Sequence, residues 1–231
     1  MLVFAVALWF AFGRNVPASA ALQPRQPVFL GVGRVLRRKN VWIVALCLAC
    51  FTALIYSLSA LLPTILAEAY GLEGKAANRV SSLLNIAAIV GSLVIPLVQV
   101  RLGKYRPLLI VLMLLTAAAV LSVRFSAQDW ILSLVCLVGF FLSAGAAFFM
   151  ATLTGLPEPD ADCLGSATGL VTLIQYILGG FLLPSCVIAP FAERSYDMLF
   201  VCAAALAAIQ ALGTALLPEV GKGRPQSTKE R

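Results

Sequence analysis

The chain contains no histidine and few charged residues of any kind. Only 12% of its 231 residues are Asp, Glu, Lys or Arg, whereas 61% are apolar, and the mean hydropathy is +0.97. A soluble domain carries charge on about a quarter of its residues, so this chain has too little polar surface to face water. We therefore predict an integral membrane protein whose solvent is the lipid bilayer.

These absences also limit the chemistry that the chain can perform. Without histidine there is no Ser-His catalytic pair, and the sequence has no glycine-rich phosphate loop. Cys47 and Cys50 have the spacing of metal ligands, but no second pair exists, and we interpret both as small buried side chains. We expect no enzyme activity, no metal and no cofactor.

Long apolar runs predict six transmembrane helices. A hydrocarbon core of about 30 Å requires about 20 apolar residues in helical form. Such runs cover residues 41–67, 80–100, 107–125, 130–154, 166–190 and 197–217, with short loops between them. They do not alternate as barrel strands do. The expected fold is all-α, with a six-helix transmembrane bundle over residues 41–218.

Leu2 to Phe12 form a shorter apolar run, which as a helix reaches only about 17 Å and cannot span the bilayer. Small residues follow at Ala18, Ser19 and Ala20, as in a secretory signal peptide. However, no basic residue precedes the run, and export would place a basic segment outside the cell. We favour the other interpretation, in which residues 1–13 are the end of a truncated transmembrane helix.

The 17 basic residues lie between the apolar runs and not along one soluble face, so the net charge of +7 does not indicate a nucleic-acid partner. If residues 14–40 are cytoplasmic, all but four basic residues lie in cytoplasmic segments. These four are Lys75, Arg79, Arg124 and Arg194. The positive-inside rule then predicts two cytoplasmic ends, and we expect the bacterial inner membrane.

The segments outside the bundle have their own composition. Residues 14–40 contain three prolines and a basic cluster, which favours a cytoplasmic linker, although Val28 to Leu36 could form a helix at the membrane surface. Residues 219–231 are rich in polar residues, Gly and Pro, and we expect a disordered cytoplasmic tail.

No Asp, Glu, Lys or Arg lies in the middle of a predicted span, so this chain lacks the usual carriers of proton coupling. Uncharged polar residues instead recur at helical spacing on single faces. These stripes are Thr52, Tyr56, Ser59 and Pro63; Ser81, Asn85, Ser92, Pro96 and Gln99; and Thr168, Thr172, Gln175 and Gly179, with Ser143 in the fourth span.

Each stripe has two interpretations. Serine and threonine commonly hold membrane helices together, and we favour that role for most of them. A carboxamide or phenol inside the membrane requires a partner or water, so Tyr56, Asn85 and Gln175 remain open between interhelical hydrogen bonds and a solute path. Tyr176 lies one residue off its stripe, and we expect it to pack.

Two segments carry a family resemblance. GSLVIPLVQVRLGKYRP, from Gly91 to Pro107, resembles the glycine-rich basic connection between the second and third helices of each half of the major facilitator superfamily. Arg101, Gly103 and Lys104 match its Arg, Gly and basic positions, whereas Val100 stands where an acidic residue is expected. GSATGLVTLIQYILGGFLLP, from 165 to 184, resembles the fifth helix of such a half. Within the superfamily, LPTILAEAYGL, from 62 to 72, and the region from Pro96 to Arg101 resemble the cyanate and nitrate permease branch.

This resemblance implies a C-terminal half, running from the end of the sixth helix through the twelfth. Members bind a small solute between two halves that rock in alternating access. The implied residues of the substrate cavity are Tyr56, Ser59, Asn85, Ser143, Thr172 and Gln175, and those of a cytoplasmic gate loop are Arg101, Gly103 and Lys104. The implied partner is a missing N-terminal half or a second copy. The alternatives are a non-transporting six-helix scaffold and a half-size carrier acting as a homodimer.

Overall fold

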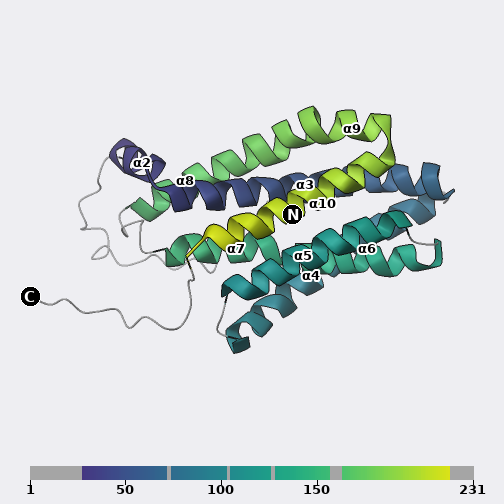
Figure 1. Cartoon of the computed structure of the whole chain (residues 1–231), viewed down its shortest axis with the longest axis horizontal. Helices are drawn as coiled ribbons and strands as arrows, with labels where there is room; N and C mark the ends of the chain where they lie inside the picture. Colours follow the sequence, from purple (N-terminus) through teal and green to yellow (C-terminus); the bar gives the residue numbers. More distant parts are fainter. Residues whose placement is uncertain (1–27, 72–73, 103–104, 126–127, 157–162, 219–231) are drawn as a thin grey trace, which may run out of the picture.

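The structure, a computed structural model, describes residues 28–71, 74–102, 105–125, 128–156 and 163–218. Every regular element in these ranges is a helix, and six helical stretches are long and apolar enough to cross a membrane (Figure 1). The expected all-α fold is therefore confirmed. The predicted truncated helix at 1–13 and the tail at 219–231 lie outside the described residues.

The helices follow the predicted spans to within a few residues. They are α2 (Val28–Leu36), α3 (Lys39–Tyr70), α4 (Gly74–Leu102), α5 (Tyr105–Phe125), α6 (Gln128–Leu142), α7 (Ala144–Gly155), α8 (Leu164–Ile174), η3 (Gln175–Ile188), α9 (Ala189–Arg194) and α10 (Tyr196–Leu216). The fourth predicted span is divided between α6 and α7, and the fifth is shared by α8, η3 and α9. The helix that Val28 to Leu36 could form is present as α2.

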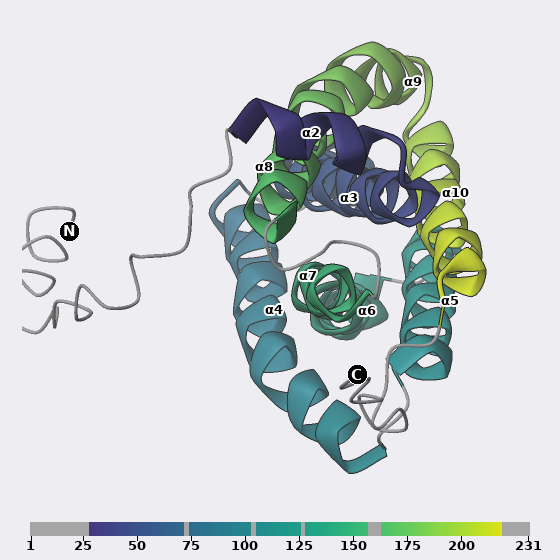
Figure 2. The same cartoon turned by 90° about the vertical axis from the view of Figure 1, so that its left-hand side faces the viewer.

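Figure 2 looks along the bundle and shows α6 and α7 at its centre, with α3, α4, α5, α8 and α10 around them. The helix α3 contributes to both apolar cores, one containing Leu48 and Phe148 and the other Leu58 and Leu84. In its most apolar stretch 72% of the residues are buried, against 17% in the span formed by α8, η3 and α9. The latter span therefore lies at the outside of the bundle.

Glycines allow two pairs of helices to approach closely. A Cβ atom on Gly139 of α6 would overlap the carbonyl oxygen of Leu84 in α4 and lie 3.2 Å from its Cα. A Cβ atom on Gly179 of η3 would likewise overlap the carbonyl oxygen of Ala49 in α3, 2.7 Å from its Cα. Only glycine fits where backbones pack this tightly. These contacts fix α4 against α6 and η3 against α3.

Hydrogen bonds fasten α10 near both of its ends. The Arg106 guanidinium of α5 donates to the carbonyl oxygen of Ala215, in the last turn of α10, where a positive charge also complements the helix dipole. Near the opposite end, the hydroxyl of Tyr196 donates to the carboxylate of Glu68 in α3. The helix α10 is thereby joined to α5 at one end of the bundle and to α3 at the other.

Candidate functional site

The element η3 is a π-helix, in which backbone hydrogen bonds join residues five apart. It contains Pro184, which has no backbone N–H and so cannot make an α-helical bond to the carbonyl oxygen of Gly180. The N–H of Ala189 donates to the Pro184 carbonyl oxygen, five residues earlier. Segments of π-helix are rare in proteins and are frequent at functional sites.

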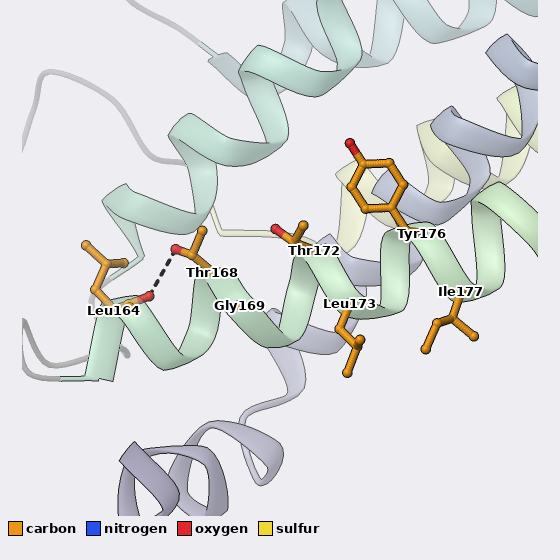
Figure 3. Close-up of a pocket in the computed structure, with 8 residues that line it drawn as sticks. Leu164, Thr168, Gly169, Thr172, Leu173, Tyr176 and Ile177 are labelled. Carbon is orange, nitrogen blue, oxygen red and sulfur yellow. Dashed lines mark hydrogen bonds between the residues drawn. The ribbon is translucent and has the colours of Figure 1, made fainter. Parts of the chain in front are cut away.

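Two rows of side chains run along α8 into η3. Figure 3 shows Thr168, Thr172 and Tyr176 pointing to one side of this helix, and Leu173 and Ile177 pointing to the other. The first row has a spacing of four residues and carries three hydroxyl groups. Thr168 donates its hydroxyl to its own helix, at the carbonyl oxygen of Leu164, 3.0 Å away. One face of this span is therefore polar and the opposite face apolar.

These rows border an open groove of about 740 Å³. Its lining residues all belong to α8 and the start of η3: Leu164, Gly165, Thr168, Gly169, Thr172, Leu173, Tyr176 and Ile177. None of them is acidic or basic. The groove therefore offers hydroxyl groups and apolar surface, and one helix supplies all of the wall that the structure describes.

The structure corrects the expected position of Tyr176. The sequence pattern placed Gln175 on the stripe with Thr172 and left Tyr176 to pack, but Tyr176 lines the groove and is 53% exposed. Residues four apart lie close to one face of a helix, and Tyr176 comes four residues after Thr172 and eight after Thr168. Tyr176 therefore continues the row of threonines.

Gln175 turns toward α3 instead. Its Nε2 donates to the hydroxyl oxygen of Thr52, 2.9 Å away, and Thr52 is buried. The sequence left two interpretations of Gln175 open, an interhelical hydrogen bond and a solute path. The structure shows the interhelical hydrogen bond. This bond joins η3 to α3 close to the contact of Gly179 with Ala49. It therefore helps to hold α8 and η3, which line the groove, against α3.

We predict that Thr52→Val and Gln175→Leu are coupled by about 0.6 kcal/mol, and by no more than about 1.7 kcal/mol, as is usual for hydrogen bonds between membrane helices. The measurement is a double-mutant cycle of unfolding free energies in mixed micelles. Thr52→Val combined with Thr168→Val is the control, because Thr168 bonds within its own helix. The prediction would be contradicted if the changes in unfolding free energy caused by Thr52→Val and Gln175→Leu were additive.

Four other predicted cavity residues occupy different environments. Tyr56, at 47% exposed, and the half-buried Ser59 lie one turn apart on α3. Asn85 is exposed on α4 and donates to the Ser81 carbonyl oxygen, 3.3 Å away. Ser143 is buried and donates to its own helix. It lies where α6 and α7 meet, not on an open face.

Ser143 also touches α4, since a Cβ atom on Gly91 would overlap its hydroxyl oxygen. It therefore belongs to the contact between α4 and the divided fourth span. Of the predicted gate residues, Arg101 is exposed in the last turn of α4, whereas Gly103 and Lys104 lie outside the described residues.

Sequence reasoning missed Gln210. Its side chain is completely buried in α10, and neither its Nε2 nor its Oε1 has a hydrogen-bond partner. The hydroxyl of Ser57 in α3 is also buried without a partner. Gln210 is the only carboxamide in the last predicted span, and that isolation in an apolar run was the signal that could have identified it.

The six apolar helices define an integral membrane protein. The family model of the Major Facilitator Superfamily matches residues 1–184, a stretch that includes both segments that carry the resemblance. The chain belongs to this superfamily, whose members transport small solutes. A search of curated proteins found no relative that matches the chain.

Proposed function

We propose that this chain is the C-terminal half of a secondary transporter that moves a small solute by alternating access. The polar row of Thr168, Thr172 and Tyr176 carries the proposal, because it borders the open groove on the least buried span, with Tyr176 exposed and both threonines half-buried. Thr168 bonds within its own helix, whereas the hydroxyl groups of Thr172 and Tyr176 have no partner among the described residues, which is unfavourable where they face lipid. A second six-helix half that covers this face would convert it into one wall of a solute path.

The second half is either an N-terminal half, whose sixth helix ends in residues 1–13, or another copy of this chain. Residues 41–218 supply the seventh to twelfth helices in this proposal. The excess of basic residues on one side supports a cytoplasmic position for both ends, and the proposed location of the bundle is a bacterial inner membrane. The segment LPTILAEAYGL favours the cyanate and nitrate permease branch.

Within this proposal, Arg101, Gly103 and Lys104 form the cytoplasmic gate loop. The bond from Arg106 to the end of α10 supports that assignment, because it anchors the start of α5 directly after the loop. Tyr56, Ser59, Asn85, Ser143, Thr172 and Gln175 are the proposed cavity residues. Thr172 and Tyr56 are best placed for direct contact with solute, whereas Gln175 and Ser143 act through helix packing.

The test is a chromosomal substitution in the source organism, so that any second half is present. We expect Thr172→Val to reduce uptake of the transported metabolite about tenfold, as loss of one hydrogen bond in the transport path would. Uptake profiles of the wild type and a deletion strain, measured by mass spectrometry, identify the metabolite.

Thr154→Val is the matched control, because Thr154 is exposed on α7, bonds to the Ala151 carbonyl oxygen 2.9 Å away, and lies outside the groove. It should leave uptake unchanged while both variants insert normally. Identical uptake in the wild type and the deletion strain would favour a non-transporting scaffold. Normal uptake in the Thr172→Val variant would show that Thr172 does not contact the transported solute.

A further inference from the structure

The rings of Tyr56 and Tyr176 both border the space above Gly180, which we call the slot. A Cβ atom at this position would lie 3.5 Å from Cε2 of Tyr56 and 3.7 Å from Cδ1 of Tyr176. Tyr56 comes from α3 and Tyr176 from η3, and about half of each side chain is exposed. The slot is therefore open to the outside of the bundle, and aromatic rings from two different helices border it.

The slot continues the polar row of the groove. Thr172, Tyr176 and Gly180 follow one another at intervals of four residues along the same helix. The contact of Gly179 with Ala49 and the bond from Gln175 to α3 lie directly beside it and fix the two tyrosine-bearing helices against each other. The helices that carry the two rings are consequently held together.

The chemistry of the slot selects a type of ligand. A planar ring inserted against a tyrosine gains about 0.5–1.5 kcal/mol beyond simple burial. Among the described residues, neither tyrosine hydroxyl has a partner, so both can bond to a ring substituent. No acidic or basic residue lines the adjoining groove, so a charged solute would lose its hydration without gaining a counter-ion.

We propose that this slot binds an uncharged planar ring that carries a hydrogen-bonding group. The identification of that ligand with the transported solute rests on the proposed function, whereas the binding site itself does not. Stacking against Tyr56 and Tyr176 supplies the preference for a flat ring, and the hydroxyl groups of the tyrosines and of Thr172 orient its polar substituent.

The test uses four probes of similar size on the purified full chain in nanodiscs, with affinity measured by equilibrium dialysis. Benzamide is planar and uncharged, cyclohexanecarboxamide is its saturated counterpart, benzamidine is cationic and benzoate is anionic. We expect benzamide to bind about 2- to 10-fold more tightly than cyclohexanecarboxamide, which is the gain in affinity that one stacked ring provides. Benzamide should also bind more tightly than benzamidine or benzoate.

Gly180→Ala fills the slot with one methyl group, which makes ordinary contacts with both rings and requires no movement. It should remove the preference for benzamide. Gly33→Ala in α2 is the matched control, since a methyl group there has nothing within 4 Å and lies outside the groove, and it should keep the preference. Tyr176→Leu should remove the preference and Tyr176→Phe should retain it.

Equal binding of benzamide and its saturated counterpart, or a preference that survives both Gly180→Ala and Tyr176→Leu, would overturn the proposal. Tighter binding of benzamidine or benzoate would overturn the assignment to uncharged rings. These outcomes are separable from the proposed function. Ring binding without any uptake in the cellular test would refute only transport, and uptake without ring preference would refute only the slot.

Discussion

Gly179→Ala should destabilise the bundle by about 1–3 kcal/mol or more, the range for overpacking a tight contact. The added methyl group would overlap the carbonyl oxygen of Ala49 and lie 2.7 Å from its Cα. Both atoms belong to the backbone of α3, which cannot rotate away as a side chain would. The helices α3 and η3 must separate, and the hydrogen bond from Gln175 to Thr52 is then weakened as well.

Gly180→Ala is the control for this prediction because it makes the same change one residue later. Its methyl group makes ordinary van der Waals contacts, the nearest at 3.5 Å, so stability should remain close to that of the wild type. Unfolding free energies in mixed micelles measure both variants. Equal stability of Gly179→Ala and Gly180→Ala would show that α3 and η3 do not approach this closely.

Gln210→Met should stabilise the protein by about 1–3 kcal/mol, the range for a buried polar group that lacks a hydrogen-bond partner. The Gln210 side chain is 0% exposed, and both polar atoms of its carboxamide are without partners. Methionine has a similar length and flexibility and no strong need for a hydrogen bond. The measurement is again the free energy of unfolding in mixed micelles.

Gln175→Met is the matched control, since it makes the same substitution at a glutamine whose amide is paired. It should lower stability, because the hydroxyl of the buried Thr52 loses its donor. Changes in unfolding free energy of opposite sign for the two substitutions would confirm that the two glutamines differ in their hydrogen bonding. A loss of stability in Gln210→Met would mean that its carboxamide is hydrogen-bonded in the folded protein.

The number and position of the spans could be predicted from the sequence because hydrophobic length is a local property. The bilayer requires about 20 apolar residues per helix wherever the helix lies in the bundle. The first predicted span, 41–67, thus corresponds to Lys39–Tyr70, and the last, 197–217, to Tyr196–Leu216. The division of the fourth span at Ser143 could not be predicted, since it arises where the helix packs against Gly91 of α4.

The candidate site was only partly predictable. The sequence identified Tyr56 and Thr172 as polar residues on helical faces, and the structure places both on open surface or in the groove. It placed Gln175 on the stripe with Thr172 and left Tyr176 to pack, although both lie within about one turn of Thr172, and the structure instead places Tyr176 in the groove. That outcome depends on the position of Thr52 in α3, which accepts the hydrogen bond of Gln175.

By itself the sequence determined that this protein lies in the membrane as six helices and resembles the superfamily to which it belongs, because composition, run length and short motifs do not depend on packing. Only the tertiary structure decided which polar residues of a stripe meet another helix and which border the groove. Helical periodicity predicts the side of the helix on which each side chain lies but not the residue that it contacts. Those contacts come from packing between helices, as where Gly179 meets Ala49 beside the slot over Gly180.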